Sequence, residues 1–156
     1  MRLHVIAVGN RMPAWVSQGY QEYARRMPPE CRLALTEISP GRRTRKADVA
    51  RILHDEGKRM LVALPPASRV ITLEVDGESW DTRGLAQRLG EWLQTGKDIA
   101  LLIGGPEGLP SACRERAESS WSLSPLTFPH PLVRVVLAEQ LYRAWTLLSG
   151  HPYHRS

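Results

Sequence analysis

The chain has 156 residues, a length that suits one domain, and 42% of them are hydrophobic, which is enough for a globular protein to bury a core. Charged residues make up 24%, an ordinary fraction that excludes a disordered acidic or basic tail as the whole molecule. The net charge of +5 is compatible with a polyanionic partner such as RNA but does not require one.

The cysteine content and the apolar runs exclude several further classes. Cys31 and Cys113 lie far apart, so they form neither a disulfide framework nor a paired metal motif, and we expect reduced thiols and no metal. The apolar run at 3–8 is too short for a signal peptide. No segment approaches the roughly 18 apolar residues of a membrane-spanning helix. We therefore expect a cytoplasmic protein without a membrane partner.

The chain begins with a strand, a helix and a second strand. Residues 3–8 predict a buried strand that ends at Gly9. Apolar residues then recur at three- and four-residue spacing, which predicts an amphipathic helix over 13–27, stopped by two prolines. Residues 32–38 alternate between apolar and polar, as a half-covered strand does.

A basic loop over 40–46 separates this strand from a second helix, whose apolar face spans 49–64. A third strand is predicted at 69–75. Asp76-Gly77 has the chemistry of a turn, so we expect the strand to end there.

The third helix begins after Asp81 or Thr82, either of which could cap it, and Gly96 suits its C-terminal end. Residues 99–103 are apolar throughout, as expected of a central strand covered on both faces. They lead directly into a glycine-containing loop at 104–108.

The last third of the chain predicts a short helix over 110–118, a short strand near 120–123, a proline-rich loop and a long apolar helix over 131–149. A short tail, 151–156, follows. Strands and helices alternate throughout, which predicts an α/β fold with a mostly parallel sheet and helices on both faces. We find no linker or repeat, so 1–156 is expected to be a single domain.

Ligands of an open parallel sheet bind beyond the carboxyl ends of its strands. Two such ends stand out, at Leu73 and at Gly104-Gly105. Glycines there let a ligand approach the backbone, although for a glycine pair alone a tight strand-to-helix turn is the better explanation. The glycine motif matches neither a dinucleotide-binding nor a Walker phosphate loop, so we expect no phosphate cradle.

The tail carries His151, Tyr153, His154 and Arg155. Such side chains stack on bases and contact phosphates, although chain ends are more often simply disordered. No cysteine or carboxylate neighbours the two histidines, so a zinc site is not expected.

Two further features each allow two interpretations. The apolar stripe of the last helix is wide enough for a subunit interface, but it could equally be core packing. A basic cluster, formed by Arg42, Arg43, Arg45 and Lys46, could grip phosphates or form a solvated surface. Together with the tail and the net charge, the cluster slightly favours contact with RNA.

Five short motifs in order identify a resemblance: residues 101–108 (LLIGGPEG), 121–124 (WSLS), 129–134 (PHPLVR), 139–145 (EQLYRAW) and 151–155 (HPYHR). With Gly9 and the PAWV run near the start, they closely resemble the RlmH family. These are bacterial large-subunit ribosomal RNA methyltransferases of the SPOUT superfamily. The resemblance covers essentially the whole chain.

The resemblance implies a C-terminal trefoil-knotted α/β fold, S-adenosylmethionine bound in the knot, and an obligate homodimer. It also implies methylation of N3 of a pseudouridine in 23S ribosomal RNA, on assembled ribosomes. The positions that match the cofactor site are Leu73, Gly104, Gly105, Leu123, Ser124, Pro125, Leu126, Thr127 and Phe128.

The N3 nitrogen carries an imide proton, so its methylation needs a general base or a cation that polarises the neighbouring carbonyls. We expect His154 or His151 to accept or relay this proton, with Tyr153 in the same network. His130 is a further candidate, although a capping role before Pro131 would explain it equally well.

Negative charge on the imide oxygens requires a stabilising cation. We expect Arg143 or Arg155 to supply it, with Glu139, four residues earlier on the same helix face, orienting Arg143. A tail that acts near the cofactor of the other subunit would enlarge the small footprint of one chain on RNA.

Other functions remain open on the sequence alone. A SPOUT methyltransferase for another RNA site would have the same fold. A non-catalytic RNA-binding factor of ribosome assembly would bind no S-adenosylmethionine, so a calorimetric titration separates the two. An unrelated α/β nucleotide-binding enzyme is disfavoured because the phosphate loops are missing.

Overall fold

Residues 1–44, 46 and 48–155 are described by a computed structural model, and five of its strands form one parallel sheet in the order β2-β1-β4-β3-β5. The strands are β1 (Arg2–Val8), β2 (Arg32–Ile38), β3 (Arg69–Ser79), β4 (Ile99–Ile103) and β5 (Ser119–Ser122). All four neighbouring pairs are parallel.

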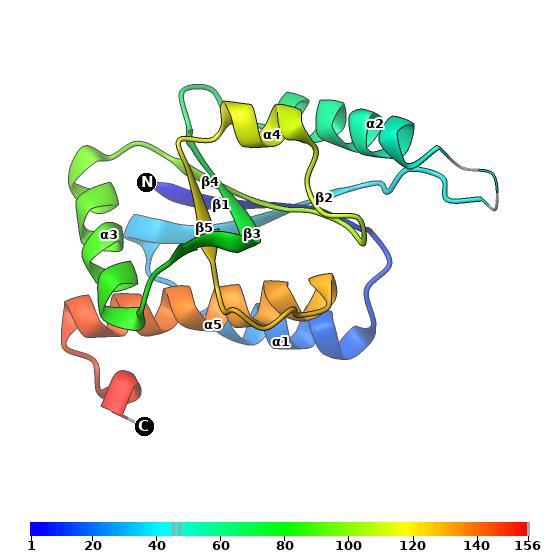
Figure 1. Ribbon diagram of the computed structural model, residues 1–156. Helices are drawn as coiled ribbons and strands as arrows, with labels where there is room; N and C mark the ends of the chain where they lie inside the picture. The colour runs from blue at the N-terminus through cyan, green and yellow to red at the C-terminus, as the bar shows by residue number, and fades with distance from the viewer. Residues whose placement is uncertain (45, 47, 156) are drawn as a thin grey trace.

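The helices lie on both faces of this sheet. They are α1 (Ala14–Ala24), α2 (Val49–Val62), α3 (Thr82–Thr95), α4 (Ser111–Arg116) and α5 (His130–Ser149), with short 3-10 turns η1 (Pro29–Cys31) and η2 (Pro152–Arg155). Figure 1 shows α2 and α4 on one face and α1, α3 and α5 on the other. The predicted α/β class is thus confirmed, whereas the trefoil knot stays a prediction.

The central strand β4 explains how two cores form. Successive side chains of a strand point to opposite faces of the sheet. Ile99, Leu101 and Ile103 accordingly pack into the core under α3 and α5, and Ala100 and Leu102 pack into the smaller core under α2 and α4. Every residue of β4 is buried, as its uniform apolar composition predicts.

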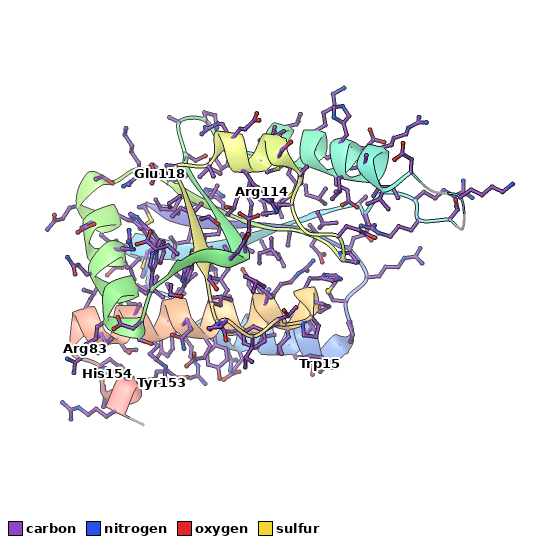
Figure 2. All side chains as sticks on the ribbon, viewed as in Figure 1. Trp15, Arg83, Arg114, Glu118, Tyr153 and His154 are labelled. Atoms are coloured by element: carbon purple, nitrogen blue, oxygen red, sulfur yellow. The ribbon has the colours of Figure 1, made fainter. Side chains whose placement is uncertain are left out.

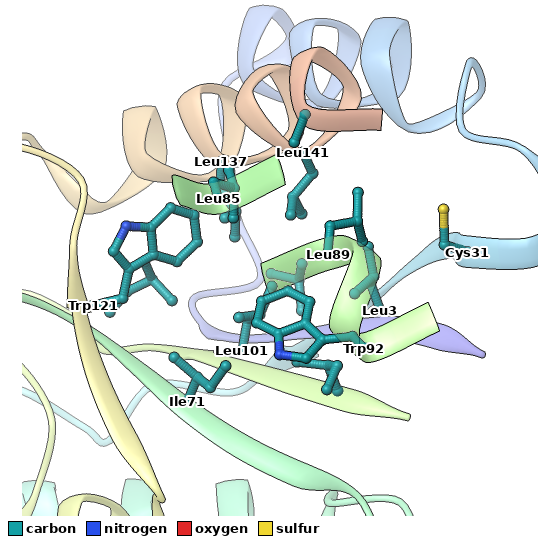
Figure 3. Close-up of a cluster of buried hydrophobic side chains, with 14 of the residues drawn as sticks. Leu3, Cys31, Ile71, Leu85, Leu89, Trp92, Leu101, Trp121, Leu137 and Leu141 are labelled. Atoms are coloured by element: carbon teal, nitrogen blue, oxygen red, sulfur yellow. The ribbon is translucent and has the colours of Figure 1, made fainter. Parts of the chain in front are cut away.

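The larger core joins the sheet to the last helix. Leu137 and Leu141 of α5 are fully buried in one core cluster with residues of α3 and the sheet, which also holds Trp121 (Figure 3). A buried side chain of this kind contributes about 1.5–3 kcal/mol to folding. This packing fixes α5 along the sheet, with its first residue near the carboxyl ends of the strands.

The predicted turn at Asp76-Gly77 is wrong, because β3 continues to Ser79. The register with β5 shifts instead, since both Leu73 and Glu78 pair with Trp121. A Cβ on Gly77 would lie 2.9 Å from the carbonyl carbons of Ser120 and Trp121, so glycine serves a close backbone approach here rather than a turn.

The structure shows which of the two candidates, Asp81 or Thr82, caps the third helix. Asp81 caps α3, and its Oδ1 accepts a hydrogen bond from the backbone N–H of Gly84 at 2.7 Å.

In the described part of the chain, no helix combines the length and apolar character needed to cross a membrane.

Candidate functional site

A cavity of about 650 Å³ lies at the carboxyl edge of the sheet, and we call it the donor cavity. Three segments converge on it: the residues after Leu73 in β3, the loop that follows β4, and the loop that joins β5 to α5. Its volume is typical of a site for a small molecule or cofactor.

The donor cavity brings together all but one of the residues that the sequence assigned to a cofactor. Eight of them line it: Leu73, Gly104, Gly105, Leu123, Ser124, Leu126, Thr127 and Phe128. Pro125 does not, although it lies in the same loop. Three stretches that are distant in the sequence thus line one cavity. A ligand that binds to all three needs them to be together in this way.

Two serines order the loop between β5 and α5. The hydroxyl of Ser122 donates to the carbonyl oxygen of Ser124 at 2.9 Å, and the N–H of Leu126 donates to Ser124 Oγ at 3.0 Å. Leu126 is 70% exposed, so its side chain forms an apolar rim beside the half-buried Phe128. Such a rim can cover one face of a planar ring.

The glycine loop folds back tightly on itself. A Cβ on Gly104 would lie 2.5 Å from the carbonyl group of Gly108, and the Gly108 N–H donates to the Gly105 carbonyl oxygen at 3.0 Å. Both interpretations of the glycine pair, a tight turn and a close approach of a ligand, are therefore compatible with the structure. Glycine makes the tight turn possible, and the same turn exposes backbone to the donor cavity.

Carboxylates lie on one side of the donor cavity. Glu74 accepts hydrogen bonds from Thr72 Oγ1 at 3.0 Å and Ser120 Oγ at 2.8 Å, and it forms an ion pair with Arg114. Asp76 also lines the cavity and is exposed. Negative groups next to apolar walls suit a ligand that combines a cation with a flat ring.

The basic loop is tied to the glycine loop by Arg43. Its guanidinium lies 2.5 Å from Glu107 Oε2 and 3.0 Å from Glu56 Oε2. The hydrogen bond from Arg43 holds the pKa of Glu107 below its usual value. Arg42 and Lys46 are exposed, and Arg45 of the predicted cluster lies outside the described residues.

The sequence interpretation missed Glu56, which is fully buried and also accepts the Gly41 N–H at 2.7 Å. A signal for it exists. Glu56 lies four residues from both Ile52 and Met60, so it is a carboxylate on the apolar face of α2. A charge at such a position requires a buried partner.

His130 does not cap α5. It is the first residue of the helix, and the N-cap, Pro129, has no capping hydrogen bond from a side chain. The Nδ1 atom of His130 is buried and has no hydrogen-bond partner in the part of the chain that the structure describes. Burial, then the charges of Arg134 and Arg43, lower the pKa of His130 below its ordinary 6.5, so the ring is neutral at pH 7.

A buried arginine lies one turn further along α5. Arg134 is 2% exposed, and it donates to the Gly9 carbonyl oxygen at 2.7 Å and to Glu37 Oε2 at 2.6 Å. It thereby binds the ends of β1 and β2 to the start of the last helix.

The C-terminal tail packs on α5 through three of the predicted residues. Glu139 Oε1 accepts hydrogen bonds from Tyr153 Oη at 3.0 Å and from Arg143 Nη2 at 2.6 Å. The Arg143 guanidinium also lies 5.0 Å from the centre of the Tyr153 ring. Burial and the Glu139 carboxylate raise the pKa of Tyr153, so this hydroxyl stays protonated at neutral pH.

The other tail residues lie near this cluster and away from the donor cavity of the same chain. His151 Nδ1 accepts the Tyr153 N–H at 3.1 Å, His154 Nδ1 is buried without a described partner, and Arg155 is exposed. None of the described tail residues, 151–155, lines the donor cavity. Figure 2 shows Tyr153 and His154 at the end of α5 remote from Arg114, which does line it.

Comparison with known proteins places this geometry among methyltransferases. Residues 1–154 match a family described as "Predicted SPOUT methyltransferase". A protein of Methylococcus capsulatus is 63% identical over 99% of this chain and 100% of its own length. One of Thioalkalivibrio sulfidiphilus is 61% identical over 99% of both. Both are named "Ribosomal RNA large subunit methyltransferase H".

Solved structures share the fold at much lower identity. A probable methyltransferase from Bordetella pertussis superposes with a TM-score of 0.56 at 15% identity, covering 92% of this chain and 95% of that one. A probable methylase family protein from Haemophilus influenzae gives a TM-score of 0.54 at 13% identity, covering 97% of this chain and 69% of that one.

Proposed function

The chain belongs to the SPOUT methyltransferase family, and from this premise we propose that it methylates large-subunit ribosomal RNA with S-adenosylmethionine bound in the donor cavity. The observation that carries the proposal is the convergence of Leu73, the glycine loop and the loop over 123–128 on that one cavity. The substrate follows from relatives that are 61–63% identical along the whole chain.

The residues of the donor cavity fit this cofactor. Leu73, Leu123 and Phe128 provide apolar walls for an adenine ring, and the backbone of the glycine loop can hydrogen-bond its edge. The carboxylates of Asp76 and of Glu74, the latter paired with Arg114, also line the cavity and can attract a sulfonium or ammonium group. When bound, S-adenosylmethionine supplies the electrophilic methyl group.

The acceptor that fits the family resemblance is N3 of a pseudouridine in 23S ribosomal RNA, on the assembled ribosome. The protein must hold this nitrogen about 3–3.5 Å from the methyl carbon, because alignment supplies much of the rate enhancement. N3 must also lose its imide proton before or as it attacks. A general base or a carbonyl-polarising cation near the donor cavity would help this step.

The tail supplies these groups from the partner subunit of a homodimer. Within one chain, His151, His154 and Arg155 do not line the donor cavity, so a composite site accounts for both their chemistry and their position. His154 or His151 accepts or relays the imide proton. Tyr153, kept protonated by burial and by Glu139, belongs to the same network and donates its hydroxyl hydrogen to Glu139 Oε1.

Arg143 or Arg155 stabilises the negative charge that develops on the imide oxygens. Arg143 is oriented for this task by two hydrogen bonds to Glu139, at 2.9 and 2.6 Å. We place the reaction in the cytoplasm, where assembled bacterial ribosomes are found.

Two measurements test the proposal. S-adenosylmethionine is titrated into the protein by calorimetry, and nucleosides of ribosomes from cells lacking the protein are mapped by mass spectrometry before and after incubation with it. We expect heat of binding and one new methyl group on a pseudouridine of 23S RNA. A methyl group on another RNA would refute the substrate, and a lack of uptake would refute the activity.

A further inference from the structure

A second cavity, of about 500 Å³, lies at the carboxyl ends of β1 and β2. The residues that follow each strand line it, with Gly9 to Met12 after β1 and Ser39 and Pro40 after β2. Pro106 and His130 line both this cavity and the donor cavity, so the two hollows are neighbours on the same edge of the sheet. No residue assigned to the cofactor lines the second cavity.

The two cavities differ in charge. Two carboxylates, Glu74 and Asp76, and one arginine, Arg114, which is paired with Glu74, line the donor cavity, whereas the second cavity is lined by Arg11 and Arg43 and by no described carboxylate. Arg43 is already paired with Glu107 and Glu56. Arg11 is exposed and forms no ion pair within the described residues, so its guanidinium can receive an anion.

Neutral hydrogen-bonding groups complete the lining. Asn10 Nδ2 donates to Ser39 Oγ at 3.2 Å, so the ends of β1 and β2 present an amide and a hydroxyl side by side. These groups can bind a ribose or the edge of a base. A cavity of this volume accommodates a small molecule the size of a nucleotide.

Two arginines that do not line the second cavity hold its walls in place. Arg134 binds the Gly9 carbonyl oxygen at 2.7 Å, and Arg59 donates to the Ser39 carbonyl oxygen at 2.9 Å. Because the walls are fixed in the free protein, a ligand meets a preformed site and loses less affinity to ordering it.

We propose that the second cavity binds a phosphate-bearing nucleotide of the RNA strand, adjacent to the nucleotide that is methylated, with Arg11 as the ligand of its phosphate. The inference rests on the proposed function, because an acceptor base at the donor cavity brings its neighbours along the strand to the same edge of the sheet. The shared wall of Pro106 and His130 is where the strand passes from one cavity to the other.

The test compares Arg11→Glu with Arg32→Glu. Arg32 is also exposed and forms no described ion pair, but as the first residue of β2 it lies at the opposite, amino edge of the sheet. With unmethylated ribosomes as substrate, Arg11→Glu should raise KM about tenfold, since a charged contact is lost. The slope of log affinity against log salt should fall by about 1. Arg11→Lys should recover part of the loss.

Other readouts should stay unchanged in Arg11→Glu. At saturating ribosome concentration kcat should match the wild type, and S-adenosylmethionine should bind with the same affinity in calorimetry. A KM and a salt slope equal to those of Arg32→Glu would overturn the inference. The inference would also be overturned if Arg11→Glu abolished inhibition by inorganic phosphate but left the KM for ribosomes unchanged. The cavity would then bind a free anion rather than RNA.

Failure of this inference and failure of the proposed function are distinguishable. Binding of ribosomes to the protein can be measured at several salt concentrations without any methyl transfer. A wild-type protein that takes up no S-adenosylmethionine refutes the enzyme assignment. An active wild type whose Arg11→Glu variant is unaltered refutes only the second cavity.

Discussion

Arg43 Nη2 lies 2.5 Å from Glu107 Oε2, and this ion pair joins the basic loop after β2 to the glycine loop of the donor cavity. The same guanidinium compensates Glu56, whose side chain is 1% exposed. The buried Glu56 carboxylate is compensated by Arg43 and by the hydrogen bond from the Gly41 N–H. One buried carboxylate thereby fixes the position of a loop that faces the proposed RNA site.

Arg43→Met should therefore destabilise the protein by roughly 3 kcal/mol, because Glu56 would be left as an unpaired buried charge. Adding Glu56→Gln should recover most of this loss, since the amide tolerates burial better. Urea unfolding of the wild type, both single variants and the double variant measures the coupling. Arg42→Met, at an exposed neighbour, should change stability by less than about 0.5 kcal/mol. Additive losses in the double variant would show that the two side chains act independently.

The glycine loop gives a second prediction. A Cβ at position 104 would lie 2.5 Å from the backbone of Gly108, so Gly104→Ala forces the loop to open. We expect S-adenosylmethionine to bind at least about tenfold more weakly in calorimetry, a loss of roughly 1.4 kcal/mol. The matched control is Gly90→Ala in α3, where the new Cβ would meet Leu148 at an ordinary 3.6 Å. If Gly104→Ala and Gly90→Ala bound S-adenosylmethionine with equal affinity, the glycine loop would not be part of the cofactor site.

His130 gives a prediction about pH. Its folded-state pKa lies below 6.5, so in the window between the folded and unfolded values the unfolded chain binds more protons than the native one. Stability should accordingly fall as the pH drops below about 6.5, the ordinary histidine pKa. His130→Gln should flatten this part of the unfolding profile. An NMR titration of the His130 ring with a midpoint above 6.5 would contradict the prediction.

The sequence predicts some elements well because their signals are local. The uniform apolar run of β4 indicates burial on both faces, and the structure places its side chains in both cores. The sequence also predicts that Leu73 and Gly104 lie at one carboxyl edge of a parallel sheet; both line the donor cavity, although β3 continues past Leu73 to Ser79, and ligand binding there stays a prediction. Each of these inferences needs only the periodicity of one segment.

The remaining features depend on partners distant in sequence. Gly77 has the composition of a turn, but β5 approaches it so closely that the strand continues through a shifted register. The docking of the tail depends on the contact of Tyr153 with Glu139, which the spacing of the tail motif does not reveal. The neighbouring cavity at Arg11 likewise exists only because β1 and β2 end where α5 begins.

The position of the tail leads to a test by subunit complementation. If the tail acts on the donor cavity of its partner, removal of residues 151–156 should abolish methylation and leave cofactor binding intact. With S-adenosylmethionine supplied well below the weakened Kd of the variant, Gly104→Ala should nearly abolish methylation with its tail intact. A mixed dimer of the two defective chains has one site in which an intact donor cavity meets an intact tail.

We therefore expect the mixed dimer to recover methylation of ribosomes, although neither parent dimer is active. Tandem affinity tags isolate the mixed dimer, and the rate per dimer is compared with that of the wild type. A variant with Arg32→Glu on the tail-deleted chain controls for changes outside the site. An inactive mixed dimer would show that each tail serves its own chain, which the separation of Tyr153 from the donor cavity disfavours. A monomer with full activity would exclude the composite site altogether.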